Sequence, residues 1–293
     1  MTAPVPHDSQ QPTVAAVAMV LGAILSIQIG AAVAIDLFSE IGAAGVVFVR
    51  AIVSAILLAV IWRPGVRTIR ENPRLLLVFG GALAGMNLCF YEAIDRIPLG
   101  VAVTLEFIGP LTVALITSRR RLDWIWAGLA AVGIVMLTGG IGGEGLDPVG
   151  VVLALAAGFF WGSYILIGKR MGRAFSGGKG LAVAMAVSAV LTAPFGIVDG
   201  GTGLLEPEVL LIGLAVGALS SALPFTLELE AMRRLPSSVF GVMMSLEPAV
   251  AAAVGMVMLG QQIIPVELFA ILLVMAASAG ALRSSRAPAP IEP

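Results

Sequence analysis

Three ionisable residues lie inside long apolar stretches of this sequence: Arg50, Glu106 and Glu247. A charged side chain at the centre of a membrane-spanning helix costs about 2.5–3.5 kcal/mol on insertion scales, so each needs a reason to be there. A buried carboxylate can take up a proton or hold a substrate ammonium group, and a guanidinium group can bind a carboxylate. These residues therefore predict a site for a zwitterion, for protons, or for both.

Two amides lie at the same depth as two of these charges. Each residue of this set is seven positions from the outer end of its apolar segment: Gln28, Arg50, Asn87 and Glu106. At 1.5 Å of rise per residue, all four lie about 10 Å below the outer ends of four different helices. The sequence thus predicts one polar layer, in which an Arg50–Glu106 pair, structural or functional, would neutralise two buried charges.

The second half of the chain has its own polar residues within apolar segments. They are Trp161, Ser163, Tyr164, Ser220, Ser221, Glu228, Ser245 and Glu247. Glu247 lies about midway along its segment, where it could carry a proton or hold an ammonium group. Glu228 lies near the inner end of its segment. Trp161 and Tyr164 could line a cavity, although aromatic residues in such segments more often serve packing.

The overall composition is that of a membrane protein. Of 293 residues, 59% are hydrophobic and only 12% are charged, whereas a soluble domain averages about 45–50% apolar and about 25% charged. The net charge of −1 offers no footprint for nucleic acid. With one cysteine, Cys89, and one histidine, His7, we expect no intrachain disulfide, metal site or cofactor. The absence of H-E-x-x-H, G-x-S-x-G and P-loop motifs argues against an enzyme or an ATP-driven pump.

Ten apolar segments approach the length of about 20 residues that a membrane-spanning helix needs. They are Thr13–Ile35, Ala43–Trp62, Leu75–Ile94, Leu99–Thr117, Trp124–Thr138, Val149–Gly168, Leu181–Val198, Val209–Ala231, Val239–Leu259 and Val266–Leu282. The fifth is short. Proline lies inside three of them, as Pro110, Pro224 and Pro248. Each proline frees a backbone carbonyl, which could face a substrate or simply mark a packing kink.

The cations predict the orientation of these segments. If the N-terminus is cytoplasmic, 15 of the 17 Lys and Arg residues lie on the inner side: Arg63, Arg67, Arg70, Arg74, Arg119, Arg120, Arg121, Lys169, Arg170, Arg173, Lys179, Arg233, Arg234, Arg283 and Arg286. Only Arg96 falls in an outer loop, and Arg50 lies within a segment. The positive-inside rule therefore predicts ten helices with both termini in the cytoplasm.

An internal repeat divides the ten segments into two groups of five. Tyr91–Pro110 and Leu229–Pro248 match at an offset of 138 residues, and each joins the third segment of its half to the fourth. Five is an odd number, so the second unit must enter the membrane inverted, as in secondary transporters. We expect an all-α polytopic membrane protein with two inverted five-helix repeats. The expected parts are a tail (1–12), repeats at 13–138 and 149–282 separated by an extracytoplasmic linker (139–148), and a second tail (283–293).

The two five-span units and the F-W-G-S-Y stretch of the sixth span resemble the EamA branch of the drug/metabolite transporter superfamily. Four stretches are similar to the threonine/homoserine exporters of bacterial inner membranes: Ser26–Phe38, Gly85–Tyr91, Ile97–Leu115 and Ser245–Ala252. The positions that match that pattern are Ser26, Gln28, Arg50, Asn87, Glu106, Glu228, Ser245 and Glu247. Asp36, Glu92 and Glu230 fall outside it, and Gly260-Gln261 replaces a Gly-Glu pair common in the family.

The resemblance implies efflux of small amino acids and use of the proton gradient. We predict a secondary active exporter in a bacterial cytoplasmic (inner) membrane, working by alternating access on a threonine- or homoserine-like zwitterion. Glu106 and Glu247 would carry the proton or bind the ammonium group. Arg50 or backbone dipoles would bind the carboxylate, with hydrogen bonds from Gln28, Asn87 and Ser245. Protons and the lipid bilayer are further partners, and a homodimer is left open.

Two other functions remain open on the sequence alone. An exporter of aromatic amino acids or drugs would have a larger and more aromatic cavity. A non-transporting membrane scaffold subunit would use its buried charges only to pair with one another.

Overall fold

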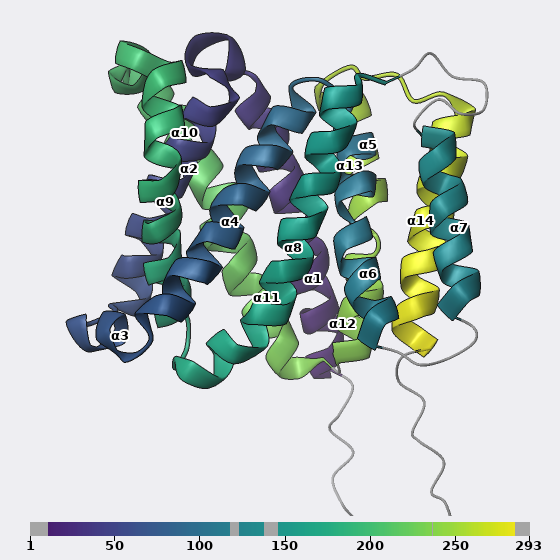
Figure 1. Ribbon diagram of the computed structural model, residues 1–293, viewed down its shortest axis with the longest axis horizontal. Coiled ribbons are helices and arrows are strands. Elements are labelled where there is room, and N and C mark those ends of the chain that lie inside the picture. The colour runs from purple at the N-terminus through teal and green to yellow at the C-terminus, as the bar shows by residue number, and fades with distance from the viewer. Residues whose placement is uncertain (1–10, 118–122, 138–145, 236, 285–293) are drawn as a thin grey trace, which may run out of the picture.

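The computed structural model describes residues 11–117, 123–137, 146–235 and 237–284, and the regular structure of these residues is entirely helical (Figure 1). Most of both predicted tails and of the predicted linker lies outside the described residues. The same holds for the predicted inner cations Arg119, Arg120, Arg121 and Arg286.

The helices follow the predicted apolar segments along the chain. In the first half they are α1 (Gln11–Ile35), α2 (Phe38–Trp62), the short α3 (Val66–Glu71), α4 (Pro73–Ile94), α5 (Leu99–Glu106), α6 (Ile108–Thr117) and α7 (Asp123–Leu137). In the second half they are α8 (Pro148–Ala174), α9 (Lys179–Gly200), the 3₁₀ turn η1 (Gly201–Leu205), α10 (Pro207–Gly217), the π-helical segment η2 (Ala218–Ala222), α11 (Leu223–Arg234), α12 (Ser237–Met244), α13 (Glu247–Met258) and α14 (Pro265–Ser284).

Among the described residues, six stretches of helix are long and apolar enough to cross a membrane: Val14–Ile35, Phe38–Trp62, Pro73–Ile94, Pro148–Ala174, Lys179–Leu205 and Pro207–Glu228. Four shorter apolar helices accompany them: Leu99–Val113, Trp124–Leu137, Val242–Met258 and Pro265–Ala281. Large apolar side chains cover the outside of the bundle, for example Val198 at 82% and Val257 at 84% exposure. Such a surface suits lipid rather than water. The predicted class, an all-helical polytopic membrane protein, is confirmed.

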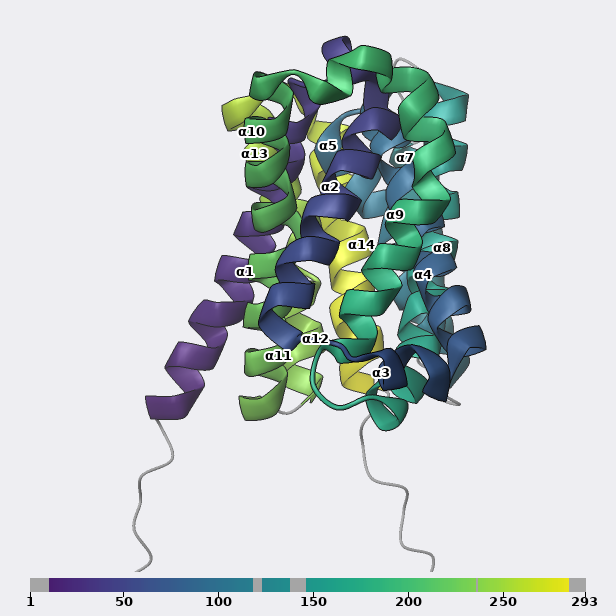
Figure 2. The same cartoon turned by 90° about the vertical axis from the view of Figure 1, so that its left-hand side faces the viewer.

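The start of α1, the end of α14 and the short α3 lie at the same end of the bundle (Figures 1 and 2). Several predicted inner cations gather there, and Arg67 and Lys179 line one hollow between α3 and the start of α9. Arg96 follows α4 at the opposite end of the bundle (Figure 1). Arg67 and Lys179 therefore lie at the end of the bundle opposite to Arg96.

The fourth, eighth and ninth predicted segments are not continuous α-helices. The fourth is interrupted at Phe107 between α5 and α6, and the ninth at Ser245 and Leu246 between α12 and α13. The eighth passes through η2 just before Pro224. Proline has no N–H to donate to the carbonyl four residues earlier, so each interruption lies within about one turn of Pro110, Pro248 or Pro224.

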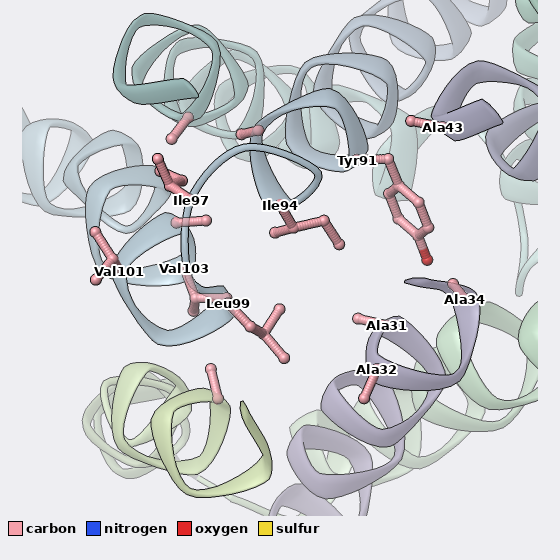
Figure 3. Close-up of a cluster of buried hydrophobic side chains, with 14 of the residues drawn as sticks. Ala31, Ala32, Ala34, Ala43, Tyr91, Ile94, Ile97, Leu99, Val101 and Val103 are labelled. Atoms are coloured by element: carbon pink, nitrogen blue, oxygen red, sulfur yellow. The ribbon is translucent and has the colours of Figure 1, made fainter. Parts of the chain in front are cut away.

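Close helix crossings hold the interrupted helix α5–α6 against α8. A Cβ atom added to Gly158 would lie 2.6 Å from the carbonyl oxygen of Glu106, and one added to Gly109 would overlap the carbonyl oxygen of Gly158. Gly158 therefore allows the backbone of α8 to approach that of the α5–α6 joint closely. Elsewhere around α5, the side chain of Leu99 points toward Ala31 of α1, and the ring of Tyr91 lies beside Ala34 (Figure 3), all within the largest apolar core of the described residues.

Candidate substrate and proton site

Arg50 joins three helical elements at the centre of the bundle. It lies on α2 and is only 8% exposed. Its Nη1 donates a hydrogen bond to Oδ1 of Asn87 on α4, and its Nη2 donates to the carbonyl oxygen of Ser220 in η2 at 2.9 Å. The guanidinium group also lies over the ring of Tyr91, 5.4 Å from its centre. The predicted proximity of Arg50 and Asn87 in one layer is confirmed.

The π-helical segment η2 is held by side chains from α1 and α2. In an α-helix the N–H of residue 224 would bond to the carbonyl of Ser220, and in a π-helix to that of Leu219, but residue 224 is proline. Instead, Ser26 Oγ donates to the carbonyl of Leu219 at 2.7 Å, and Arg50 donates to that of Ser220. Pro224 can donate a hydrogen bond to neither the Leu219 nor the Ser220 carbonyl. Side chains far away in the sequence donate to both carbonyls instead.

Three carboxylates come from three different helices of the candidate site. Glu106 is the last residue of α5 and Glu247 the first residue of α13, and both are buried, whereas Glu228 on α11 is half-buried. Glu247 is close enough to Glu106 and Glu228 for their charges to interact, and Glu106 likewise interacts with Arg50. In the described part of the chain, no group of three or more acidic, Cys or His residues could hold a metal ion.

The direct Arg50–Glu106 ion pair considered from the sequence is not formed. The ion pairs among the described residues join other partners. Nη1 and Nη2 of Arg50 instead donate hydrogen bonds to Asn87 and Ser220, and the guanidinium group interacts with Glu106 at longer range.

Several buried polar atoms on the helices that carry these residues have no hydrogen-bond partner within the described structure. They are Gln28 Oε1, Arg50 Nε, Tyr91 Oη, Ser220 Oγ, Ser221 Oγ and Glu247 Oε2. A buried polar group without a partner costs about 1–3 kcal/mol, so a cluster of them calls for an explanation. Because these atoms come from α1, α2, α4, η2 and α13, they fit a site whose hydrogen bonds are completed by a polar ligand.

The remaining predicted site residues lie nearby but have partners. Ser245 Oγ, in the interruption between α12 and α13, donates to the carbonyl of Val242 in the last turn of α12 at 2.5 Å. Trp161 packs edge-on against Phe107 with ring centres 5.3 Å apart, and Tyr164 stacks on Phe79 at 4.8 Å. These two aromatic rings of α8 therefore pack against α4 and the α5–α6 joint.

Two of the three acids outside the family pattern lie in partly exposed ion pairs. Glu92 pairs with Arg96 at 2.9 Å, and Glu230 pairs with Arg234 at 2.5 Å. This agrees with an interfacial rather than a central position for both.

Sequence comparison identifies relatives along nearly the whole chain. The threonine/homoserine exporter RhtA of Escherichia coli K12 is 41% identical over 272 residues, covering 92% of each chain. RhtA of Salmonella typhimurium LT2 is 42% identical over 270 residues, covering 92% of this chain and 91% of the relative. Residues 148–283 match the model of the EamA-like transporter family. The chain belongs to the EamA-like transporter family.

More distant matches agree with this EamA-like membership. The uncharacterized transporter YwfM of Bacillus subtilis is 28% identical over 193 residues, which is 64% of this chain and 65% of the relative. A crystal structure that is 19% identical superposes with a TM-score of 0.65 over 92% of this chain and 97% of that one, so the two share a fold. The EamA-like protein is a multi-pass membrane protein, and the predicted inner-membrane location agrees with its relatives.

In this EamA-like chain, the sequence reasoning did not find the π-helical segment or the role of Ser26 in holding it. A signal was present, because Pro224 follows Ser220 and Ser221 within an otherwise apolar segment. That pattern indicates freed carbonyls beside buried hydroxyl groups. Which side chains reach those carbonyls depends on how α1 and α2 pack, and the local sequence does not predict that packing.

Gln261, which replaces the family's glutamate, caps a helix of the other half of this EamA-like protein. Its Oε1 accepts a hydrogen bond from the backbone N–H of Leu99, the first residue of α5, at 3.0 Å. We predict that Gln261→Ala lowers the free energy of unfolding by about 1 kcal/mol, as loss of a helix cap does. Gln261→Glu keeps the acceptor and should change it by less. Thermal unfolding in detergent checks both, and equal effects of the two variants would contradict the capping role.

Proposed function

We propose that this protein exports threonine, homoserine or closely similar small amino acids from the cytoplasm, driven by the proton gradient. The observation that carries the proposal is identity of 41–42% over 92% of the chain with exporters named for these substrates. The central cluster of an arginine, three carboxylates and unpartnered polar atoms gives that similarity a chemical basis. A zwitterion needs both a cationic and an anionic partner.

We further propose ten spans arranged as two inverted repeats, 13–138 and 149–282, with both termini cytoplasmic. Two structural features recur at the offset of 138 residues and support this arrangement. The helix interruption at Phe107 corresponds to that at Ser245, and the ion pair Glu92–Arg96 corresponds to Glu230–Arg234. Near-symmetry of this kind allows two halves to close alternately over a central site.

In the proposed site, Arg50 binds the substrate carboxylate and Glu106 binds the ammonium group. Nε of Arg50 is buried without a partner, and the guanidinium and Glu106 charges already interact. An amino acid placed between them would pair its carboxylate with Arg50 and its ammonium group with Glu106. Gln28 Oε1 is available as a further hydrogen-bond acceptor. Asn87 orients the guanidinium group through Nη1.

Glu247 is the proposed proton carrier. Its Oε2 has no partner, and its carboxylate faces the like charges of Glu106 and Glu228 rather than an arginine. Three carboxylates within electrostatic range favour a state in which at least one holds a proton. Binding of a substrate ammonium group beside Glu106 would alter that balance, and this links the proton to the substrate.

Counterflow in proteoliposomes tests the substrate. We expect labelled threonine and homoserine to exchange into liposomes loaded with either unlabelled amino acid, and phenylalanine to exchange at least about tenfold more slowly, because the aromatic rings of α8 are used for packing. An imposed pH gradient should drive net accumulation. Failure of both small amino acids to exchange would contradict the proposal, and preference for phenylalanine would favour the aromatic alternative.

A further inference from the structure

A basic hollow of about 330 Å³ lies between the short helix α3 and the start of α9, far from the candidate substrate site. Its inner wall includes the buried residues Thr68 and Phe175. Its rim includes the exposed residues Arg67 and Ser176 and the half-buried Lys179. The hollow thus combines two cations, two hydroxyl groups and an apolar wall at the end of the bundle where α3 lies (Figure 2).

The two cations of the rim have nitrogens available for an anion. Arg67 pairs with Glu71 through Nε alone, at 3.0 Å, and its Nη1 and Nη2 have no hydrogen bond to a described residue. Lys179 takes part in none of the ion pairs among the described residues. One carboxylate therefore stands against two cations, and the hollow is net positive. Guanidinium and ammonium groups of this kind bind phosphate oxygens through charge-assisted hydrogen bonds.

Further donors without partners lie deeper in the hollow. Thr68 is only 8% exposed, and its hydroxyl group makes no hydrogen bond within the described part of the chain. Because buried hydroxyl groups normally have a partner, this one points to a polar ligand in the hollow. Lys179 is also the first residue of the 22-residue helix α9. The first N–H groups of a helix lack partners within the helix, so they add to the preference for an anion.

Close packing against α2 fixes the loop that carries Ser176. Gly177 has a φ of 60°, and a Cβ atom added there would lie 2.7 Å from Cζ3 of Trp62, the last residue of α2. A Cβ atom added to Gly178 would overlap the indole nitrogen of the same side chain. Only glycine permits this backbone conformation and this approach without strain. The positions of Ser176 and Lys179 beside α3 are therefore set by packing.

Helix α3 places the hollow at the level of lipid headgroups. Val66 is 66% exposed and Ile69 is 50% exposed, and their spacing of three residues puts them on one side of the helix. The helix lies at the end of the bundle, directly after α2 (Figures 1 and 2). A helix with exposed apolar residues and arginines lies in the membrane interface, with its apolar side chains at the acyl boundary. Arg67 and Arg70 then lie at the level of the phosphates.

We propose that this hollow is a binding site for the headgroup of an anionic phospholipid such as phosphatidylglycerol. Arg67 and Lys179 bind the phosphodiester, and the hydroxyl groups of Thr68 and Ser176 donate to its oxygens. A zwitterionic lipid fits less well, because its ammonium group would meet the same cations. In the proposed orientation the lipid belongs to the cytoplasmic leaflet, whose anionic lipids attract basic segments. The site does not depend on what the protein transports.

Native mass spectrometry of the protein in detergent tests the site with dioleoyl phosphatidylglycerol and dioleoyl phosphatidylcholine. We expect the parent protein to bind the anionic lipid at least about tenfold more tightly. Arg67→Gln combined with Lys179→Gln should weaken its binding at least about tenfold, because each interfacial cation adds to the attraction. Arg70→Gln combined with Arg74→Gln is the matched control. It removes two exposed cations that do not line the hollow, and binding should change by less than about threefold.

Ser176→Trp tests the hollow itself without changing its charge. Ser176 is exposed at the rim, so an indole ring there can occupy the space of the headgroup, and binding of phosphatidylglycerol should weaken at least about fivefold. Thermal unfolding without added lipid checks that the variant is folded, and it keeps the test available if the Arg67 and Lys179 variant does not fold.

Three outcomes would overturn the site. Equal weakening in the two double variants, or parent-like binding in Ser176→Trp, would show that the lipid is held by diffuse charge. Equal affinity of the parent for both lipids would show no preference for an anionic headgroup. Displacement of the lipid by millimolar glycerol 3-phosphate would assign the hollow to a soluble phosphate. Lipid binding is measured without amino acid, so these outcomes are distinct from failure of threonine and homoserine to exchange, which would contradict only the proposed function.

Discussion

Glu247→Gln should abolish the accumulation of threonine driven by a pH gradient while leaving threonine counterflow within about threefold of the parent rate. Glutamine has nearly the same shape as glutamate and keeps a polar side chain, but it cannot take up and release a proton. Removal of a positioned proton-transfer group typically slows a reaction about 100-fold or more. Counterflow exchanges substrate without net proton movement, so it needs the site but not the proton cycle. Both rates are measured in the same proteoliposomes.

Two comparisons make this experiment specific to Glu247. Glu208→Gln, at an exposed position in the first turn of α10, should leave both rates unchanged. Glu106→Gln removes the proposed ammonium partner, so both rates should fall together. Gradient-driven accumulation that survives in Glu247→Gln would assign the proton to another group. Loss of counterflow in Glu247→Gln alone would instead make Glu247 the ammonium ligand. A non-transporting scaffold subunit would show neither rate in the parent protein.

Hydropathy and cation spacing predicted the helical segments well because both are imposed by the bilayer. Apolar length is set by membrane thickness and cation placement by the inner side, so neither depends on detailed packing. The ends of the helices are less predictable. The sixth predicted segment stops at Gly168, but α8 continues through charged residues to Ala174. Polarity ends the part of a helix that can lie in lipid, but it does not end the helix itself.

Part of the candidate site was also predictable from the sequence. Counting turns along two helices placed Arg50 and Asn87 at one depth, and the structure joins them by a hydrogen bond. The second partner of Arg50, the main-chain carbonyl of Ser220, could not be predicted this way. Every residue has a main-chain carbonyl, so residue type gives no signal for it. Pro224 indicates only that a carbonyl is free. Whether α1, α2 or a substrate satisfies it depends on how the helices cross.

Gly109→Ala is expected to prevent the protein from reaching a stable fold. A methyl group at this position overlaps the carbonyl oxygen of Gly158, and both atoms belong to backbones of helices that cannot give way as a side chain can. Overpacking a buried contact typically costs about 1–3 kcal/mol, and a backbone clash lies at or above the upper end of that range. We expect little monodisperse protein after extraction, and a clearly lower unfolding temperature in what remains.

Gly128→Ala is the matched control for this clash. Nothing lies within 4 Å of a methyl group added at Gly128 on α7, and alanine favours a helix over glycine by about 1 kcal/mol, so this variant should be neutral or slightly stabilised. Equal stability of the two variants would show that α8 can move away from Gly109. The crossing also matters for function, because Gly158 approaches the carbonyl oxygen of Glu106 at the same contact. Close packing of two glycines thus sets where the α5–α6 joint holds its carboxylate, and any variant that widens the crossing should weaken threonine binding before it unfolds the protein.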